Sequence, residues 1–336
     1  TMVQVNTSVW AGNDAALVIC GSAAPSSLFP LLTGANTGGT WTSPLGTPHS
    51  GVYGPALDAP GAYRYTVTGL PGCDPDTAQV TVSETTAPDG GTLVGNAEHC
   101  GTTNSGTLIL SGHSGNMLWQ KRINAGPWVD FVNATATYTY SNLAIGTYSY
   151  RVLLDAPGCP QAISNTVTVV VTDPPNAGTA NPILVCAGTS FTLDVLVINE
   201  DMNGTWTDMN GTVVSGTVMP MVTTHYTYTV PGNGTCASDS RTVQVIVEQR
   251  PNAGSNGSLT LCSTEAPVNL FSALGGTPAA GGMWTGPTAI SGGLYDASTM
   301  DPGTYTYTVS GQIPCPSAQS VVVITEVTAT ANTTTI

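Results

Sequence analysis

The sequence repeats a pattern of one cysteine, a tryptophan some residues later, an alternating Tyr/Thr/Val run and a second cysteine. The pattern occurs four times and uses all eight cysteines of the 336 residues. A period of about 75 to 85 residues divides the chain into small units and argues against one large domain. The cysteine pairs are Cys20 and Cys73, Cys100 and Cys159, Cys186 and Cys236, and Cys262 and Cys315, with Trp41, Trp119, Trp206 and Trp284 inside them.

Each repeat consists of short runs with strand character between turns rich in Gly, Pro and Asn. In the last repeat, residues 305–309 alternate Tyr and Thr before Val, which is typical of a strand with one buried face. Residues 320–324 then form an apolar closing strand. About seven such strands, with turns every eight to twelve residues, are typical of an antiparallel sandwich. We therefore predict an all-β fold: a tandem array of four Ig-like antiparallel β-sandwich domains, with one disulfide each.

The repeat boundaries predict six segments. Short proline-containing linkers predict stiff junctions, and about 35–40 Å per repeat gives a rod on the order of 150 Å. Two explanations of the ends stay open: a window of a longer array, which we favour, or head-to-tail polymerisation by exchange of terminal strands. The predicted segments are 1–9 as the terminal strand of a preceding repeat, 10–86 as repeat 1, 87–173 as variant repeat 2, 174–249 as repeat 3, 250–326 as repeat 4 and 327–336 as a C-terminal extension.

The cysteine usage is typical of structural disulfides. With one pair per repeat and no CxxC motif, the cysteines indicate an oxidising location outside the cytoplasm. We expect each disulfide to lie within its repeat and to staple one end of the sandwich. Closing such a loop of 50 to 60 residues contributes roughly 4 kcal/mol in the chain-entropy model. Zinc binding is disfavoured, because four ligands would have to come from two repeats.

Charge excludes one class of partner. The chain has a net charge of −14 and only 6 basic residues, so it lacks the basic face that nucleic acids require. It also has no apolar run long enough to span a membrane, and we predict an extracellular or cell-surface location.

Candidate catalytic and metal-binding residues are few. The histidines His49, His99, His113 and His225 occupy unrelated repeat positions, and the sequence contains no HExxH or GxSxG motif. We therefore expect no enzyme activity and no cofactor. Asp201 and Asp208 each begin an Asp-Met-Asn-Gly motif that could contribute to a calcium site. A hairpin turn explains Asp-x-Asn-Gly with fewer assumptions, so calcium remains the lesser alternative.

Several segments resemble the Ig-like repeats of large cell-surface, adhesin-like proteins of the Bacteroidota, which are associated with gliding motility and type IX secretion. The similar segments are Pro-Asn-Ala-Gly at 175–178 and 251–254, Leu-Thr-Leu-Cys at 259–262, Gly-Gly-Met-Trp at 281–284 and Gly-Thr-Tyr-Thr-Tyr-Thr-Val at 303–309; repeat 2 is similar to a sister type through Trp119-Gln, Trp128 and Cys159-Pro. The resemblance implies secretion, surface display and a structural or adhesive role. Asp76-Thr77-Ala78 also looks like the short O-glycosylation motif of such proteins, which makes Thr77 a glycosylation candidate.

These observations lead to two hypotheses about function. The first is a non-catalytic extracellular structural or adhesive protein, a rod-like segment of a bacterial surface adhesin or fibre, whose partners are neighbouring repeats or subunits end to end. The alternative is a carbohydrate-binding accessory region of a secreted enzyme, contacting surface glycans. That alternative requires exposed aromatic platforms, for which Tyr53, Trp128 and Tyr295 are the candidates, although aromatic residues inside such repeats usually belong to the core.

Overall fold

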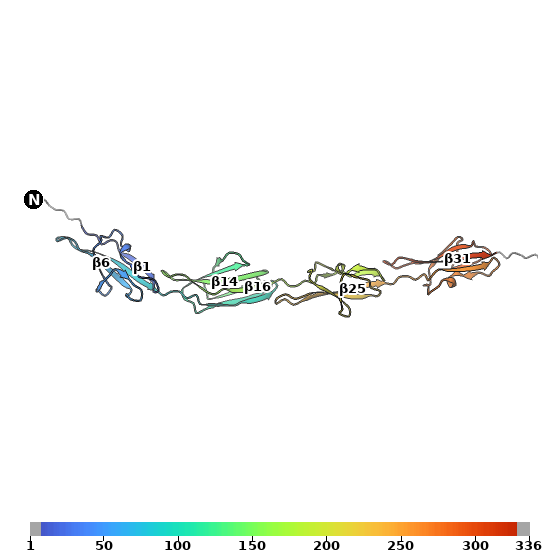
Figure 1. Ribbon diagram of the computed structural model, residues 1–336, viewed down its shortest axis with the longest axis horizontal. Helices are drawn as coiled ribbons and strands as arrows, with labels where there is room; N and C mark the ends of the chain where they lie inside the picture. The colour runs from blue at the N-terminus through green and yellow to red at the C-terminus, as the bar shows by residue number, and fades with distance from the viewer. Residues whose placement is uncertain (1–7, 328–336) are drawn as a thin grey trace, which may run out of the picture. The chain divides into compact units, whose positions relative to one another are not determined.

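The computed structural model describes residues 8–327, which form four β-sandwiches, each with its own hydrophobic core (Figure 1). We number them sandwich 1 to sandwich 4 in chain order. The predicted array of Ig-like sandwiches is confirmed. The terminal strand predicted at 1–9 and the extension predicted at 327–336 lie outside the described residues, apart from their innermost positions.

Sandwiches 1, 3 and 4 share one plan, in which a large sheet faces short strand pairs. Each also contains a short 3-10 helix: η1 (Phe29–Leu31), η2 (Leu193–Leu196) or η3 (Leu270–Ala273). Sandwich 1 orders its large sheet as β1 (Ala15–Cys20), β7 (Asp76–Thr85), β6 (Gly61–Val67), β3 (Thr40–Thr42) and β4 (Pro48–His49), opposite β2 (Ser26–Ser27) and β5 (Val52–Tyr53).

The corresponding sheets of sandwiches 3 and 4 repeat this order. In sandwich 3 the large sheet is β18 (Ile183–Cys186), β25 (Asp239–Glu248), β24 (Thr224–Val230), β21 (Thr205–Asp208) and β22 (Val213–Val214). Two short strand pairs complete this sandwich: β19 (Phe191–Thr192) pairs with β23 (Thr217–Val218), and β17 (Thr179–Ala180) pairs with β20 (Val197–Ile198). In sandwich 4 it is β26 (Gly257–Cys262), β31 (Ala318–Val327), β30 (Gly303–Val309) and β28 (Met283–Thr285), with the pair β27 (Val268–Asn269) and β29 (Leu294–Tyr295).

Sandwich 2 is built differently from the other three. Two of its strands, β14 and β16, run antiparallel side by side (Figure 1). One sheet is β12 (Val129–Phe131), β11 (Asn116–Ile123), β14 (Gly146–Asp155), β16 (Val167–Thr172) and β9 (Ala97–Cys100), with β15 (Ala162–Ile163) on β14; the other is β13 (Thr137–Ser141), β10 (Ser105–Ser111) and β8 (Thr92–Val94).

One pairing recurs in all four sandwiches: the strand that ends in the first cysteine runs parallel to the closing strand. These pairs are β1 with β7, β9 with β16, β18 with β25 and β26 with β31. Their last partners are Cys20 with Thr85, Cys100 with Thr172, Cys186 with Glu248 and Cys262 with Val327. The parallel direction places the first cysteine at the end of the sandwich where the closing strand finishes.

The second cysteine lies in the turn that precedes the closing strand. Cys73, for example, comes shortly before Asp76, where β7 begins. A strand of 10 residues spans roughly 30 Å. A disulfide requires two Cα atoms within about 7 Å, so Cys20 and Cys73 cannot meet inside sandwich 1. The prediction that each disulfide lies within its repeat is therefore wrong. It assumed that both cysteines of a repeat lie at the same end of their sandwich.

A tryptophan, a tyrosine and a glycine form a common core element in sandwiches 1, 3 and 4. In sandwich 3, the Trp206 and Tyr228 ring centroids are 5.0 Å apart, and the Gly204 N–H donates to the Tyr228 hydroxyl at 2.9 Å. A Cβ at Gly204 would lie 2.2 Å from that ring, so only glycine fits two positions before this tryptophan. The same arrangement joins Trp41 to Tyr65 and Trp284 to Tyr307.

The described chain divides into two compact units. One holds the chain up to Pro174 together with Gly234–Cys236, and the other holds Pro175–Asn233 together with the chain from Ala237 onward. Among residues 8–327, no helix has the length and apolar character needed to cross a membrane.

Candidate functional site

Three disulfides connect the sandwiches within residues 8–327, and each joins the first cysteine of one sandwich to the second cysteine of the next. They are Cys20–Cys159, Cys100–Cys236 and Cys186–Cys315, with sequence separations of 139, 136 and 129. Their Cα–Cα distances of 4.7, 5.0 and 4.9 Å are typical of disulfides. This pairing replaces the predicted one and makes the links between sandwiches, rather than their interiors, the most distinctive chemistry of the chain.

Each link, which we call a joint, has two halves. The socket is the end of the parallel strand pair, with the first cysteine beside the last residue of the closing strand. The plug is the turn that carries the second cysteine of the following sandwich. In the joint between sandwiches 1 and 2, the Thr85 hydroxyl donates to the Pro157 carbonyl oxygen, and the Cys159 sulfur lies 3.8 Å from the Thr85 carbonyl oxygen.

The other two joints repeat this socket geometry. The sulfur of Cys236 lies 3.8 Å from the Thr172 carbonyl oxygen, and that of Cys315 lies 3.3 Å from the Glu248 carbonyl oxygen. In every joint the same carbonyl also accepts the backbone N–H of the residue that follows the first cysteine: Gly21, Gly101 or Ala187. The position of the backbone, and not a particular side chain, therefore defines the socket.

The plug is shaped by a tight turn. The Cys159 N–H donates to the Ala156 carbonyl oxygen at 3.0 Å, and Gly158 adopts a φ of +74°. A Cβ at Gly158 would lie 2.6 Å from the Val18 carbonyl oxygen, so the turn lies directly against the backbone of sandwich 1. Glycine thus serves two purposes here, the left-handed conformation and the close approach to the neighbouring backbone.

Two cysteines, Cys73 and Cys262, form no disulfide within the described part of the chain. Cys73 is partly exposed and Cys262 is exposed. By position, Cys73 belongs to a plug, on sandwich 1, and Cys262 to a socket, on sandwich 4. The prediction that all eight cysteines form disulfides within this chain is therefore corrected to six.

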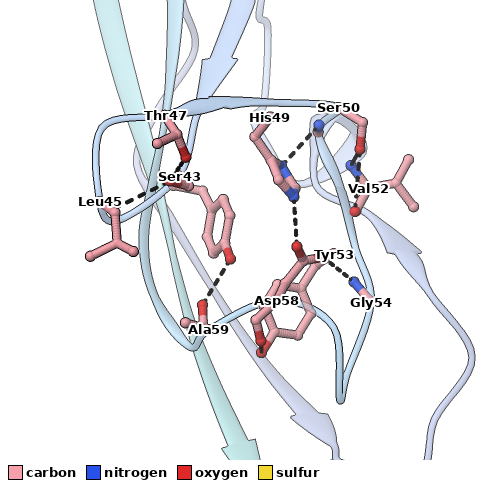
Figure 2. Close-up of polar contacts among 12 residues, drawn as sticks. Ser43, Leu45, Thr47, His49, Ser50, Val52, Tyr53, Gly54, Asp58 and Ala59 are labelled. Atoms are coloured by element: carbon pink, nitrogen blue, oxygen red, sulfur yellow. Dashed lines mark hydrogen bonds and ion pairs between the residues drawn. The ribbon is translucent and has the colours of Figure 1, made fainter.

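A polar cluster in sandwich 1 brings together His49, Tyr53, Asp58 and Glu84. Figure 2 shows the His49 ring pointing at Asp58, with His49 Nε2 3.3 Å from Asp58 Oδ1. On its other side, His49 Nδ1 accepts the Gly51 N–H at 3.1 Å, and Asp58 Oδ2 accepts the Gly54 N–H at 2.7 Å (Figure 2). Both imidazole nitrogens are occupied by loop contacts, so the geometry of this cluster holds two turns together.

The tyrosine of this cluster is part of a buried pair that sandwich 4 repeats. The Tyr53 hydroxyl donates to Glu84 Oε1 at 2.8 Å, and the Tyr295 hydroxyl donates to Glu326 Oε1 at 2.5 Å. Both tyrosine side chains are fully buried. Burial raises the pKa of both tyrosines well above the ordinary value, and the hydrogen bond to the adjacent glutamate raises it further.

The other histidines lie apart from one another. His99 Nε2 is 2.9 Å from the Tyr140 hydroxyl oxygen, and His113 Nδ1 is buried without a hydrogen-bond partner among residues 8–327. The same described residues contain no cluster of three or more His, Cys, Asp or Glu side chains suited to a metal ion. A surface hollow of about 370 Å³ beside β11 and β12 has Asp130 as the one ionisable side chain in its lining.

The two calcium candidates lie in turns. Asp208 Oδ1 accepts the N–H groups of Asn210 and Thr212, each at 2.9 Å, in the hairpin between β21 and β22. Asp201 Oδ2 accepts the Asn176 N–H at 2.9 Å, and the Asp201 carbonyl accepts the Tyr228 hydroxyl. Each carboxylate thus ties a loop to backbone N–H groups of its own sandwich, and the structure does not bring the two together.

The aromatic candidates for a sugar platform are not arranged as one. Tyr53 and Tyr295 are fully buried core residues. Trp128 stacks against two guanidinium groups, with the Arg122 and Arg151 Cζ atoms 4.8 and 4.2 Å from the ring centroid. Thr77 is exposed on β7 beside Asp76, whose carboxylate accepts the Ala11 N–H at 2.7 Å, so Asp76 also has a structural role. Glycosylation of Thr77 stays a prediction.

Comparison with known proteins adds little beyond this architecture. Residues 89–173, which contain sandwich 2, match a family model described as a domain of unknown function (DUF8696). No curated protein matches the chain. Similar solved structures include the I67-I69 fragment of titin, with 13% identity over 72% of this chain and 96% of that chain and a TM-score of 0.36. Insect hemolin matches with 11% identity over 94% of this chain and 98% of that chain, at a TM-score of 0.30. These TM-scores are too low to support an inference about function.

Proposed function

We propose that this chain is a non-catalytic, load-bearing segment of an extracellular structural or adhesive protein, such as a bacterial surface adhesin or fibre. The observation that carries the proposal is the disulfide pairing, in which each bond links one sandwich to the next. Disulfides persist in oxidising surroundings, which supports a location outside the cytoplasm. The sequence resemblance to Bacteroidota surface repeats supports display on a bacterial cell.

Disulfides between sandwiches limit how far the chain can be stretched. The shortest covalent path from Ser8 to Val327 crosses from Cys20 to Cys159 and from Cys186 to Cys315, and it leaves residues 21–158 and 187–314 off the path. At about 3.5 Å per residue, that path extends to roughly 190 Å, whereas the reduced chain extends to roughly 1,100 Å. A disulfide confined to one sandwich would shorten the extended covalent path only by the residues of the loop that it closes within that sandwich.

The joints also stabilise the folded array. In the chain-entropy model, closing a loop of about 130 to 140 residues contributes about 5 kcal/mol, compared with roughly 4 kcal/mol for a loop inside one repeat. The three loops overlap, because Cys100 lies within the loop closed by Cys20–Cys159 and Cys186 lies within the loop closed by Cys100–Cys236. When one sandwich unfolds, the applied force is therefore still carried along the shorter covalent path through the disulfides.

Single-molecule stretching between the two ends tests this function. The oxidised chain is expected to stiffen at roughly 190 Å, without long unfolding steps, and the same molecules in a reducing agent are expected to unfold in steps up to roughly 1,100 Å. The double variant Cys20→Ser with Cys159→Ser is the matched control, since it frees one joint and keeps the others. An oxidised chain that extends as far as the reduced one would contradict the proposal.

A further inference from the structure

The unbonded Cys262 occupies a socket with the geometry of the three closed ones. Strand β26 pairs in parallel with β31, and Cys262 faces Val327 as Cys186 faces Glu248. The turn after the cysteine is also the same: the Cys262 carbonyl accepts the Glu265 N–H at 3.0 Å, as the carbonyls of Cys20 and Cys186 accept N–H groups at 2.9 Å. Val327 has no hydroxyl group, but neither has Glu248, whose socket is closed.

The unbonded Cys73 occupies a plug that matches the closed plug of Cys159. Pro71-Gly72-Cys73 has the same residues as Pro157-Gly158-Cys159. The Cys73 N–H donates to the Leu70 carbonyl oxygen at 2.9 Å, as the Cys159 N–H does to Ala156 at 3.0 Å. Gly72 also has a positive φ, +97°, compared with +74° for Gly158.

The two plugs differ in what covers them. A Cβ at Gly158 would lie 2.6 Å from the Val18 carbonyl oxygen, whereas a Cβ at Gly72 would meet no described atom within 4 Å. The glycine that makes a close approach in the closed joint is therefore present, in the same conformation, on a face that the described chain leaves open. The plug is therefore preformed, and no atom of residues 8–327 lies where the Gly72 Cβ would point.

From these two half-joints we propose that copies of this chain link head to tail, by a disulfide between Cys73 of one copy and Cys262 of another. The new joint would repeat the contact between a cysteine sulfur and the socket carbonyl that occurs three times within the chain, with a plug like that of Cys159. It extends the proposed load-bearing function from one chain to a covalent series of chains. The two ideas can fail separately, because the stretching experiment concerns joints inside a single copy.

The linkage is an ordinary thiol–disulfide exchange with a small disulfide such as oxidised glutathione as the oxidant. The Cys262 thiolate attacks that disulfide, forms a mixed disulfide and releases one glutathione thiolate. The Cys73 thiolate of a second copy then attacks the Cys262 sulfur and releases the other. Two cysteine thiols are oxidised, one glutathione disulfide is reduced to two thiols, and the two cysteine protons end on the released glutathione.

Acidic side chains flank both halves, which gives the reaction a salt dependence. Asp74 follows Cys73 and Glu265 lies beside Cys262, where its carboxylate accepts the Cys262 N–H at 3.0 Å; both residues are exposed. Because like charges repel across the new joint, added salt should speed linkage. Raising the ionic strength from about 0.05 to 0.5 M is expected to increase the rate about two- to fivefold.

The decisive experiment uses the oxidised 336-residue chain in a glutathione redox buffer, followed by thiol blocking and a non-reducing gel. The wild type should form a ladder of covalent oligomers with a Cys73–Cys262 linked peptide. Cys73→Ser alone and Cys262→Ser alone should stay monomeric, and an equal mixture of the two should stop at dimers. Dimers of either single variant would overturn the proposal, since they would come from Cys73–Cys73 or Cys262–Cys262 bonds.

A second comparison tests the plug contact itself. Gly72→Ala in the Cys262→Ser chain should slow linkage to the Cys73→Ser chain about tenfold, because its Cβ would meet the socket backbone. Gly38→Ala is the matched control, since Gly38 has a φ of +92° and open space around it. Reaction of Cys73 with glutathione should stay unchanged in both variants. Equal linkage rates for the two alanine variants, or native Cys262 bonded to a cysteine outside this sequence, would contradict the proposal.

Discussion

Sandwich 2 and sandwich 4 build their interiors differently yet carry the same linking elements. Trp119 of sandwich 2 is fully buried, and its indole Nε1 donates to the Thr135 carbonyl oxygen at 3.2 Å. Trp284 of sandwich 4 is only partly buried and packs on Tyr307. In both sandwiches, however, a parallel strand pair ends at the first cysteine and a turn presents the second. The joint therefore depends on strand ends and turns, and it tolerates different cores.

Because the joints tolerate different cores, the two outer joints are expected to stabilise the array equally. Removing Cys20–Cys159 or Cys186–Cys315 by paired serine substitutions should each lower the free energy of unfolding by about 2 to 5 kcal/mol. Since the loops of 139 and 129 residues differ little in closure entropy, the two losses should agree within a few tenths of a kcal/mol. Denaturant unfolding of both double variants measures this. A large difference would mean that the surrounding core matters to the joint.

Substitution of the two tryptophans, Trp119 and Trp284, should lower the free energy of unfolding by different amounts, unlike removal of the two outer joints. Trp119→Ala removes a fully buried side chain and is expected to cost about 3 to 5 kcal/mol, whereas Trp284→Ala should cost about half as much because its side chain is partly exposed. Denaturant unfolding followed by fluorescence provides the measurement. Neither variant should alter the disulfide map, and a changed map in either would link the core to the joint.

The buried tyrosines predict a loss of stability at alkaline pH. Burial raises the pKa of Tyr53 and Tyr295, so the folded state holds these protons more tightly than the unfolded state. Their contribution is complete below the unfolded pKa of about 10 and is lost as the pH rises above it. The double variant Tyr53→Phe with Tyr295→Phe should show a shallower decline of unfolding free energy above about pH 10. The test needs Cys73 and Cys262 alkylated first, so that thiol exchange does not interfere, and an unchanged slope would contradict the assignment.

The smallest expected effect concerns the loop contact specific to sandwich 1. His49→Gln removes the partly exposed pair with Asp58, 3.3 Å apart, and should lower the unfolding free energy by less than about 1 kcal/mol. Thermal unfolding compared with wild type is sufficient to detect it. A much larger loss would show that His49 organises more of sandwich 1 than the two turns it contacts.

The sequence predicted the fold well because strand and turn signals are local. Alternation in residues 303–309 and the glycine two residues before each of Trp41, Trp206 and Trp284 follow from pleat geometry and close packing. The disulfide pairing could not be predicted in this way, since eight cysteines allow 105 connectivities. The correct choice depends on whether the opening strand runs parallel to the closing strand, which neither Cys20 nor its neighbours reveal. The identical Pro-Gly-Cys turns at Cys73 and Cys159 show that the second cysteines of repeats 1 and 2 have the same local sequence, but they do not show which cysteine each one bonds.

Mass spectrometry of the oxidised protein, digested without reduction after blocking of its thiols, shows whether each disulfide joins two neighbouring sandwiches. We expect linked peptides containing Cys20 with Cys159, Cys100 with Cys236, and Cys186 with Cys315. In the monomer, Cys73 and Cys262 should both carry the blocking group. Peptides that link Cys20 to Cys73 or Cys186 to Cys236 would contradict it, because they would place the disulfides inside single sandwiches.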